Sequence, residues 1–359
     1  MDSEMRIVVV ADDITGAAEL AGIAFSHGLS VCFACGNTMT VTHSVTVIAT
    51  DTRSMTEVEA VAETRAVAAR LASQAVPFLL FKKTDSALRG HVVAELGALM
   101  AVTGLSHAVY LPANPSKGRI IRQGVYYING EAIDQTDFRF DPEFPARSAM
   151  MTERFPEAAT LGITMPDATQ ASDIQEAVDQ ADADTILAGG GDLFEALIKK
   201  LMGDGVSPIT NTPTLPSALP LLLLCGSTQS KVPAGMTTAA MPLKVYNGDD
   251  DLKAWLSDAA TKYEQYGKLA LSIPHHHRTG RDVAVRMRRL MATMARSLVE
   301  RKMPARLVIE GGATAFATLR LLGWQQFSVS AQLARGVVEL LTPQGVSVVL
   351  KPGSYPWQL

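Results

Sequence analysis

The stretch RIVVVADDITGAAELAGIAFSHG, residues 6–28, decides the fold class of this 359-residue chain. Residues 7–11 are apolar throughout, which is typical of a strand that is covered on both faces in a parallel sheet. Two aspartates follow, and the Ala-rich run after them predicts a helix. A buried strand that leads directly into a helix is the repeating unit of α/β domains.

The same unit recurs along the chain. Buried strands are predicted in 29–36, 44–50, 77–83 and 107–111, with helices at 56–74 and 90–103. The pattern restarts at 219–227 and continues with strands in 268–273, 305–312 and 346–353 and a long helix at 282–302. We therefore predict two three-layer α/β domains with mainly parallel sheets.

Residues 203–220, GDGVSPITNTPTLPSALP, interrupt this periodicity with a composition typical of a linker. The length also favours two domains, at roughly 150 residues each. We predict a first domain at 1–212, a second at 217–359 and a ligand cleft between them.

Composition and charge exclude several classes. Apolar residues make up 47% of the chain and the net charge is −4, so neither disorder nor general attraction to nucleic acid or anionic membranes is expected. No apolar run is long enough for a membrane helix or a signal-peptide core. Three scattered cysteines do not form a disulfide framework, and a cytoplasmic protein is expected.

The C-x-x-C pair Cys32 and Cys35 favours a buried strand over a zinc or redox site, and the run 275–277 of three histidines favours a loop over a metal site.

Polar residues follow the predicted strands of the first half. Asp12 and Asp13 come directly after the first strand, where carboxylates can reach a substrate hydroxyl; capping of the next helix by Asp13 is the alternative. Other candidates follow the later strands of this half: Arg53, Lys82, Lys83, Asp85, Ser86, Arg89, Asn114, Lys117 and Arg119. Because side chains alternate along a strand, only one of Lys82 and Lys83 can enter the cleft. Surface loops with solvated charges are the alternative for the others.

The second half ends its strands with small residues. The turns CGST (225–228), GGAT (311–314) and KPGS (351–354) let a backbone approach phosphates closely and offer amide and hydroxyl donors. None matches the P-loop or the dinucleotide fingerprint. Together the three turns predict a nucleotide phosphate site, although tight glycine turns also end many strands for structural reasons.

The motifs ADDITGA, DTRS, KKTDSALRG and PANPSKGR, in this order and spacing, resemble the four-carbon acid sugar kinase family, as does GRIIRQGVYYINGEAIDQTDF after them. The resemblance implies a substrate-binding first domain, a nucleotide-binding second domain, and ATP-dependent phosphorylation of the terminal hydroxyl of a tetronate or 3-oxo-tetronate. It places the nucleotide contacts at Ser227, Gly311, Gly312, Ala313, Thr314 and Gly353. The chain departs from the family at Ala313, where a glutamate is usual.

The expected mechanism is in-line transfer from ATP, with Mg²⁺ on the phosphates. Asp13, or else Asp12, takes the proton of the attacking hydroxyl. Arg53, Lys82 and Arg89 hold the substrate carboxylate, and Asp85 holds its hydroxyls. A homodimer is compatible with the sequence, and a metal ligated by the protein alone is not expected. The alternatives are a catalytically silent sugar-acid-binding protein and a dehydrogenase or isomerase on the same scaffold.

Overall fold

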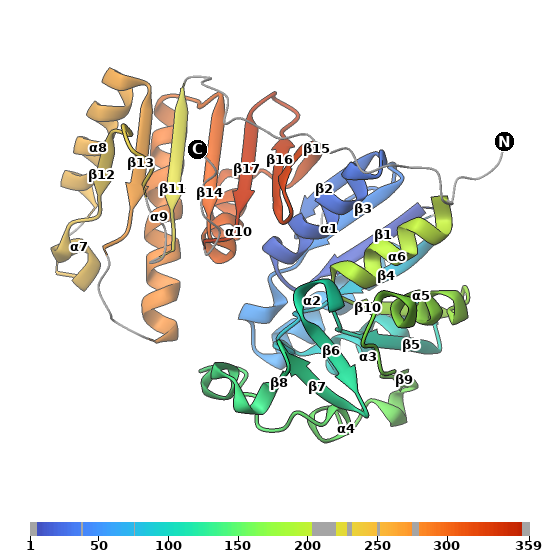
Figure 1. The fold of residues 1–359 in the computed structure, drawn as a ribbon. Helices are drawn as coiled ribbons and strands as arrows, with labels where there is room; N and C mark the ends of the chain where they lie inside the picture. Colours follow the sequence, from blue (N-terminus) through green and yellow to red (C-terminus); the bar gives the residue numbers. More distant parts are fainter. Residues whose placement is uncertain are drawn as a thin grey trace. The chain divides into compact units, whose positions relative to one another are not determined.

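A computed structural model describes residues 6–36, 39–74, 76–202, 220–227, 232–249, 252–274 and 280–353 (Figure 1). The chain divides into two compact units, Met1–Ile209 and Thr210–Leu359. The predicted linker at 203–220 lies almost wholly outside the described residues, so the bounds 1–212 and 217–359 stay predictions. The predicted cleft between the domains also stays a prediction, and each unit is described by itself.

The first unit contains a parallel sheet in the order β2-β3-β1-β4-β10-β5-β9. Its strands are β1 (Arg6–Ala11), β2 (Val31–Cys35), β3 (Val45–Ala49), β4 (Phe78–Lys83), β5 (His107–Leu111), β9 (Ile163–Thr164) and β10 (Thr185–Gly189). Its helices are α1 (Ile14–Ser26), α2 (Glu57–Ala72), α3 (Val92–Thr103), α4 (Met151–Arg154), α5 (Ala171–Gln180) and α6 (Gly191–Met202).

The helices of this unit lie in two layers. The chain leaves β1 through α1 toward one edge of the sheet, and leaves β3 through α2 toward the other, so right-handed crossovers place α1 and α2 on opposite faces. In agreement, α1 packs on α6 and α6 on α5, whereas α2 packs on α3. The order in which strands are added to the sheet therefore reverses beside β1, first toward β2 and then toward β4. In α/β sheets, ligands bind outside the carboxyl ends of the strands at such a reversal.

Local sequence explains how the elements near this point begin and end. Residues Ile7–Ala11 of β1 are buried on both faces, as their apolar run predicts. The side chain of Asp13 caps α1, and Thr56 and Glu59 form a capping box at the start of α2.

A small antiparallel sheet follows β5 and was not predicted. It consists of β6 (Arg119–Arg122), β7 (Val125–Ile128) and β8 (Glu131–Ala132). Its turns place Gln123 and Asn129 at φ 52°, each followed by a glycine with positive φ. Two successive residues with positive φ form a two-residue turn whose twist matches that of the flanking strands, and Asn-Gly is the sequence signal for this kind of hairpin.

The second unit contains a sheet in the order β12-β13-β11-β14-β17-β16-β15. The first five strands are parallel, and β16 runs antiparallel to β15 and β17. The strands are β11 (Leu221–Cys225), β12 (Thr238–Ala240), β13 (Lys268–Ser272), β14 (Arg306–Glu310), β15 (Gln326–Ala334), β16 (Val337–Leu341) and β17 (Ser347–Lys351). The helices are α7 (Leu243–Asn247), α8 (Lys253–Tyr266), α9 (Arg281–Arg301) and α10 (Gly312–Leu322), and α9 packs against both α8 and α10. The predicted α/β class with mainly parallel sheets is confirmed, whereas the β15–β16 hairpin was missed.

Candidate active site

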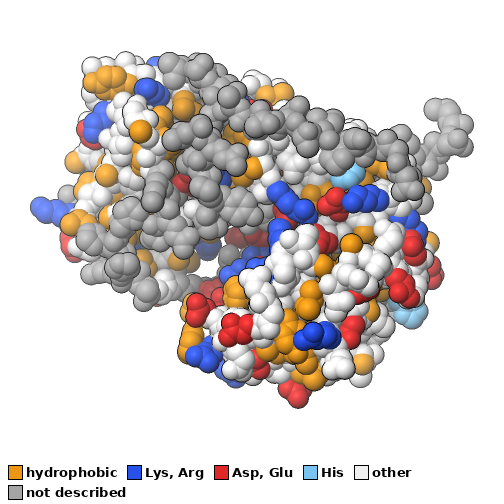
Figure 2. Space-filling model, viewed as in Figure 1, with side chains coloured by type: hydrophobic (Ala, Val, Ile, Leu, Met, Phe, Trp, Pro, Cys, Tyr) orange, Lys and Arg blue, Asp and Glu red, His pale blue; other side chains and the backbone are white. Residues whose placement is uncertain are grey.

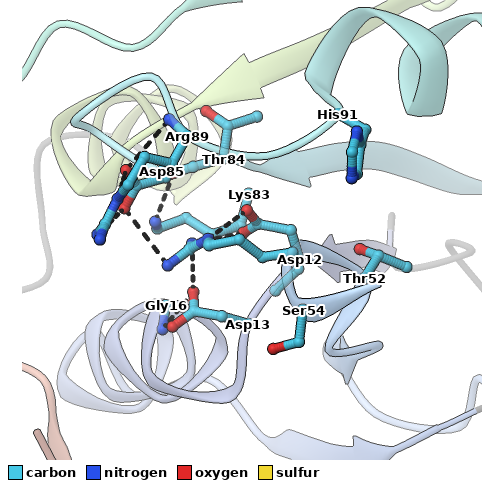
Figure 3. Close-up of polar contacts among 12 residues, drawn as sticks. Asp12, Asp13, Gly16, Thr52, Ser54, Lys83, Thr84, Asp85, Arg89 and His91 are labelled. Carbon is cyan, nitrogen blue, oxygen red and sulfur yellow. Dashed lines mark hydrogen bonds and ion pairs between the residues drawn. The ribbon is translucent and has the colours of Figure 1, made fainter. Parts of the chain in front are cut away.

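The carboxyl ends of three neighbouring strands of the first unit bring charged side chains together (Figure 3). Asp12 and Asp13 follow β1, and Asp85 follows β4. Arg53 comes from the short 3-10 helix η1 (Thr52–Ser54) after β3. The sequence predicted all four residues, and the structure joins them into one cluster.

Arg53 is the centre of the cluster. Its Nε and Nη2 donate to the two carboxylate oxygens of Asp12, both at 2.9 Å, which is the bidentate geometry that only arginine provides. Nη2 also donates to Asp13 Oδ1 at 2.8 Å, and Nη1 lies 3.4 Å from Asp85 Oδ1. The guanidinium therefore serves three carboxylates of the chain itself, and the expectation that it holds the substrate carboxylate does not fit this geometry.

The adjacent carboxylates of Asp12 and Asp13 differ in their electrostatics. Burial raises the pKa of Asp12, and the attraction of Arg53 does not fully offset it. Burial also opposes ionisation of Asp13, but Arg53, Lys83 and the hydroxyl of Thr15 lower its pKa below the ordinary value. The side chain of Asp13 is 16% exposed and that of Asp12 only 2%, so Asp13 is the one that a ligand can reach.

Asp13 has a second role, because its Oδ1 accepts from Gly16 N at 3.1 Å and caps α1. Thr15 Oγ1 donates to its other oxygen. A side chain on Gly16 would place Cβ 2.5 Å from Asp13 Oδ1 and 3.0 Å from Lys83 Nζ, so this close turn requires glycine. The predicted alternative, helix capping by Asp13, is thus confirmed alongside its place in the cluster.

The two lysines at the end of β4 point to opposite faces, as alternation requires. Lys83 lies on the α1 side, where its Nζ donates to the carbonyl of Thr84 at 2.7 Å and its charge lowers the pKa of Asp13. Lys82 points to the other face, where its Nζ lies 2.6 Å from Glu95 Oε2 of α3 and its side chain is 1% exposed. The prediction that Lys82 holds the substrate carboxylate is therefore wrong, and Lys83 is the lysine of the cluster.

The loop after β4 is closed by its own ion pair. Asp85 accepts from Arg89 Nε at 2.8 Å and Nη2 at 3.1 Å and from the backbone N–H of Ala87 at 3.0 Å. Burial alone would raise the pKa of Asp85, but Arg53 and Arg89 hold it well below its usual range. Leu88 adopts φ 59° while it is buried, so the loop is held in a conformation that side chains rarely adopt.

Arg89 and Arg119 are the cations at the more open side of this loop. The side chain of Arg89 is 34% exposed, and its Nη1 lies 3.7 Å from Asp141 Oδ2. Arg119 donates a hydrogen bond to the hydroxyl of Ser86, and both residues were among the candidates predicted from the sequence. Both arginines and Ser86 therefore lie next to Asp85, in a position to meet an anionic group.

Asn114 and Lys117 have other partners. Asn114 is 1% exposed, and its Oδ1 accepts from the backbone N–H of Asp192 at 2.9 Å, so it orders the start of α6. The prediction that Asn114 faces a ligand does not fit this position. Lys117 Nζ lies 2.5 Å from Glu19 Oε1 on α1 and is 32% exposed. Glu95 was missed by the sequence reasoning, although it is the one charged residue of the otherwise apolar helix α3.

The predicted glycine turns of the second unit converge at the ends of β11, β14 and β17. A Cβ on Gly353 would lie 2.4 Å from Ser227 Cβ, and a Cβ on Gly226 would lie 2.2 Å from Thr314 Oγ1. Gly311 adopts φ 94° and leads into Gly312 at the start of α10, whose first turn has no side-chain cap. Ala313 is exposed on that turn. A helix start with closely packed, side-chain-free backbone fits a phosphate group.

Two further predictions concern metal and membrane. Within the part of the chain that the structure describes, no group of three His, Cys, Asp or Glu side chains is arranged to hold a metal, and no helix is long and apolar enough to cross a membrane. Cys32, Cys35 and Cys225 are buried. The histidine run at 275–277 lies outside the described residues. In Figure 2 the charged side chains of both signs are interspersed over the visible face of the first unit.

The description of one family model agrees with the geometry of the first unit. The model of a sugar-binding N-terminal domain matches residues 7–196, more than half of the chain. The chain belongs to this family. A model of a nucleotide-binding C-terminal domain matches residues 251–355, which include the glycine turns at 311–314 and 353.

Curated relatives of this sugar-binding family member are named as kinases. A D-threonate kinase of Salmonella typhimurium is 28% identical over 42% of this chain and 36% of its own length. A 3-oxo-tetronate kinase of Brucella melitensis is 26% identical over 56% of this chain and 44% of its own length. The chain thus spans less than half the length of these two relatives. A D-threonate kinase of Bordetella bronchiseptica is 27% identical over 97% of this chain and 94% of its own length.

Solved structures share the fold of this family member. A protein of Salmonella typhimurium, described as a putative tRNA synthase, gives a TM-score of 0.78 at 20% identity and covers 98% of this chain and 96% of its own. A Haemophilus influenzae protein gives a TM-score of 0.72 at 19% identity over 98% and 97% of the two chains. At these identities the likeness establishes the fold alone.

Proposed function

We propose that this protein is an ATP-dependent kinase that phosphorylates the terminal hydroxyl of a four-carbon sugar acid, a tetronate or 3-oxo-tetronate. The observation that carries the proposal is the pair Asp12 and Asp13 at the end of β1, one buried with a raised pKa and one reachable with a lowered pKa. The family descriptions and the kinase names of the relatives support it.

Asp13 accepts the proton of the attacking hydroxyl in this proposal. It is the more exposed carboxylate, and its position is fixed from both sides by Gly16 N and Arg53. A lowered pKa makes Asp13 a weak base, but phosphoryl transfer passes through a loose transition state in which positioning of the hydroxyl matters more than basicity. Asp12 orients Arg53 through its bidentate pair.

Arg89 and Arg119 hold the substrate carboxylate. Arg89 is the more open partner of Asp85, and Arg119 reaches the same loop through Ser86. Asp85 accepts hydrogen bonds from the substrate hydroxyls, Ser86 donates to or accepts from them, and Lys83 adds positive charge between Asp13 and Asp85. Lys117 is held by Glu19 over the first turns of α1.

The nucleotide phosphates bind the backbone of Ser227, Gly311, Gly312, Ala313, Thr314 and Gly353. The close packing of these turns and the uncapped first turn of α10 support this placement. Mg²⁺ neutralises phosphate charge when bound, and it commonly keeps several waters and binds mainly through substrate phosphates, so it needs no group of three protein ligands, and the described residues contain none arranged to hold a metal. We also place the protein in the cytoplasm, as a monomer or homodimer.

The test is ADP release from Mg-ATP with a panel of tetronates and 3-oxo-tetronates. We expect turnover with one acid and its loss in Asp13→Asn, which keeps the helix cap. Asp173→Asn is the matched control, since Asp173 also accepts amide hydrogen bonds at a helix start but lies on α5. Binding of an acid without any turnover would instead support the catalytically silent binding protein, which the kinase names of the relatives do not favour.

A further inference from the structure

A buried ion pair behind the charged cluster is not used by the proposed chemistry. Lys82 and Glu95 are both 1% exposed in their side chains, and their charged atoms lie 2.6 Å apart. Removing two charges from water costs several kcal/mol per ion, and apolar replacement of such a pair is often neutral or stabilising. The pair is therefore poorly explained by stability, and its other contacts indicate what it does.

Glu95 Oε2 also binds the segment that carries Arg53. Thr52 Oγ1 donates to it at 2.9 Å, and Thr64 Oγ1 of α2 does so at 3.3 Å. Thr52 is the first residue of η1 and is completely buried. The residue before it, Asp51, adopts φ 58°, which side chains rarely occupy unless the surroundings hold them. The hydrogen bond from Thr52 to Glu95 holds the next residue of this segment in place.

A second set of contacts joins the same segment to β1. Thr50 N and Oγ1 both donate to the carbonyl of Ala11, at 3.0 and 2.8 Å, and Thr50 Oγ1 lies 3.0 Å from Thr52 Oγ1. Arg53 N then donates to the carbonyl of Asp12 at 3.2 Å. Because Thr52 gives its only proton to Glu95, the single hydroxyl proton of Thr50 is shared between the carbonyl of Ala11 and Thr52 Oγ1.

We propose that Lys82, Glu95 and Thr52 are positioning residues, which fix η1 so that the Arg53 guanidinium meets both oxygens of Asp12 and still reaches Asp13. Lys82 pairs with Glu95, Glu95 anchors Thr52, and Thr52 sets the position of the next residue in the chain. None of the three touches substrate. The inference rests on the proposed function for its effect on turnover, but not for its effect on Arg53.

The first test is Thr52→Val, which removes the hydroxyl and keeps the shape of the side chain, with Thr52→Ser as the conservative variant that retains the donor. We expect kcat to fall about 10- to 100-fold in Thr52→Val, as for a slightly misplaced catalytic group. KM for ATP should not change, and Thr52→Ser should restore kcat. A fall in thermal stability with kcat intact would show a merely structural role and overturn the inference.

Thr46→Val is the matched control. Thr46 lies on β3, is completely buried, and its hydroxyl has no hydrogen-bond partner in the described part of the chain. The same chemical change should therefore leave kcat unchanged there. An equal loss in Thr46→Val would mean that any altered buried threonine disturbs the sheet, and would also overturn the inference.

The second test separates the pair from stability. In the double variant Lys82→Met with Glu95→Leu, thermal stability should stay equal or rise, whereas kcat should fall as in Thr52→Val. A stable double variant with full kcat would refute the role of the pair.

A third measurement does not depend on turnover. The Nε–H resonance of Arg53 in ¹⁵N-labelled protein, assigned with Arg53→Lys, should be protected from solvent exchange by Asp12 and should lose protection in Thr52→Val but not in Thr52→Ser. If the wild-type protein phosphorylates no acid, the proposed function fails while this measurement still decides the positioning role. Unchanged protection in Thr52→Val would refute it.

Discussion

Replacement of Arg53 by methionine should destabilise the first unit in a way that depends on pH. The variant leaves the carboxylates of Asp12, Asp13 and Asp85 close together without the cation that pairs with all three. Breaking a buried pair by removing one partner costs about 3–5 kcal/mol. Because the side chain of Arg53 is 18% exposed, we expect the lower end, about 3 kcal/mol near pH 7. This corresponds to a fall in melting temperature of about 6–12 °C for a unit of this size.

The pH dependence follows from the sign of each shift. In the wild type, Arg53 lowers the pKa of Asp13 and Asp85. At pH values above the pKa that these groups have in the unfolded chain, the two aspartates therefore stabilise the folded state, and this stabilisation is lost only in strong acid. Without Arg53 both pKa values rise relative to the wild type, because burial then opposes ionisation with one cation fewer, although Arg89 and Lys83 remain beside Asp85 and Lys83 beside Asp13. When the pKa of a carboxyl group rises in the folded state, the protonated form is favoured there. The stability of the folded state is then highest below about pH 4 and falls as the pH rises. The deficit of Arg53→Met should therefore grow from pH 4 to pH 7.5.

Calorimetry at both pH values is the appropriate assay, because all three tryptophans lie beyond residue 250 and the first unit contains none. Arg296→Met is the control: it removes an i,i+4 pair with Glu300 whose side chains are 51% and 59% exposed, worth about 0.3–0.5 kcal/mol. An equal deficit for Arg53→Met at pH 4 and pH 7.5, or one no larger than that of the control, would refute this reasoning.

Two further predictions concern the second unit. Gly353→Ala would bring Cβ to 2.4 Å from Ser227 Cβ and separate the glycine turns, so affinity for ATP in equilibrium dialysis should fall at least about tenfold, as for loss of one good hydrogen bond to a charged group. Gly97→Ala on α3 of the first unit, whose Cβ would meet only the side chain of Leu161 at 3.4 Å or more, should leave that affinity unchanged; equal losses would count against the phosphate site. Burial, with the nearby Glu310, raises the pKa of Cys225 to about 12, so iodoacetamide at pH 8 should label it only after denaturant is added, as judged by mass spectrometry. Rapid labelling of the native protein would contradict the burial of this thiol.

Local patterns were sufficient for much of the fold and part of the site. The apolar run before Asp12, and the same kind of run before Lys82, predicted buried parallel strands whose ends meet. Alternation also predicted that Lys82 and Lys83 diverge. Which lysine joins the cluster depends on the faces that α1 and α3 cover, and that follows from strand order rather than from the residues around Lys82.

Other features were missed because their partners are distant in sequence. Arg53 was predicted as a ligand for a substrate carboxylate, since no local pattern shows that Asp12, 41 residues away, occupies it. Glu95 stands alone as a charge in an apolar helix, and this was a signal that a buried partner exists. The Asn129-Gly130 pair was likewise a hairpin signal that could have predicted β7 and β8.

The position of β10 has a consequence for how the first unit can assemble. This strand lies between β4 and β5, yet it is the last of the sheet to leave the ribosome, and Thr84 N at the edge of the charged cluster bonds to its final residue, Gly189. Until about residue 190 has emerged, β4 and β5 have no neighbour between them and expose strand edges that invite association with other chains. At synthesis rates of about 5–20 residues per second, this interval lasts several seconds after β5 is made. Fragments that end before β10 should therefore aggregate rather than fold, and the cluster should form late in the life of the nascent chain.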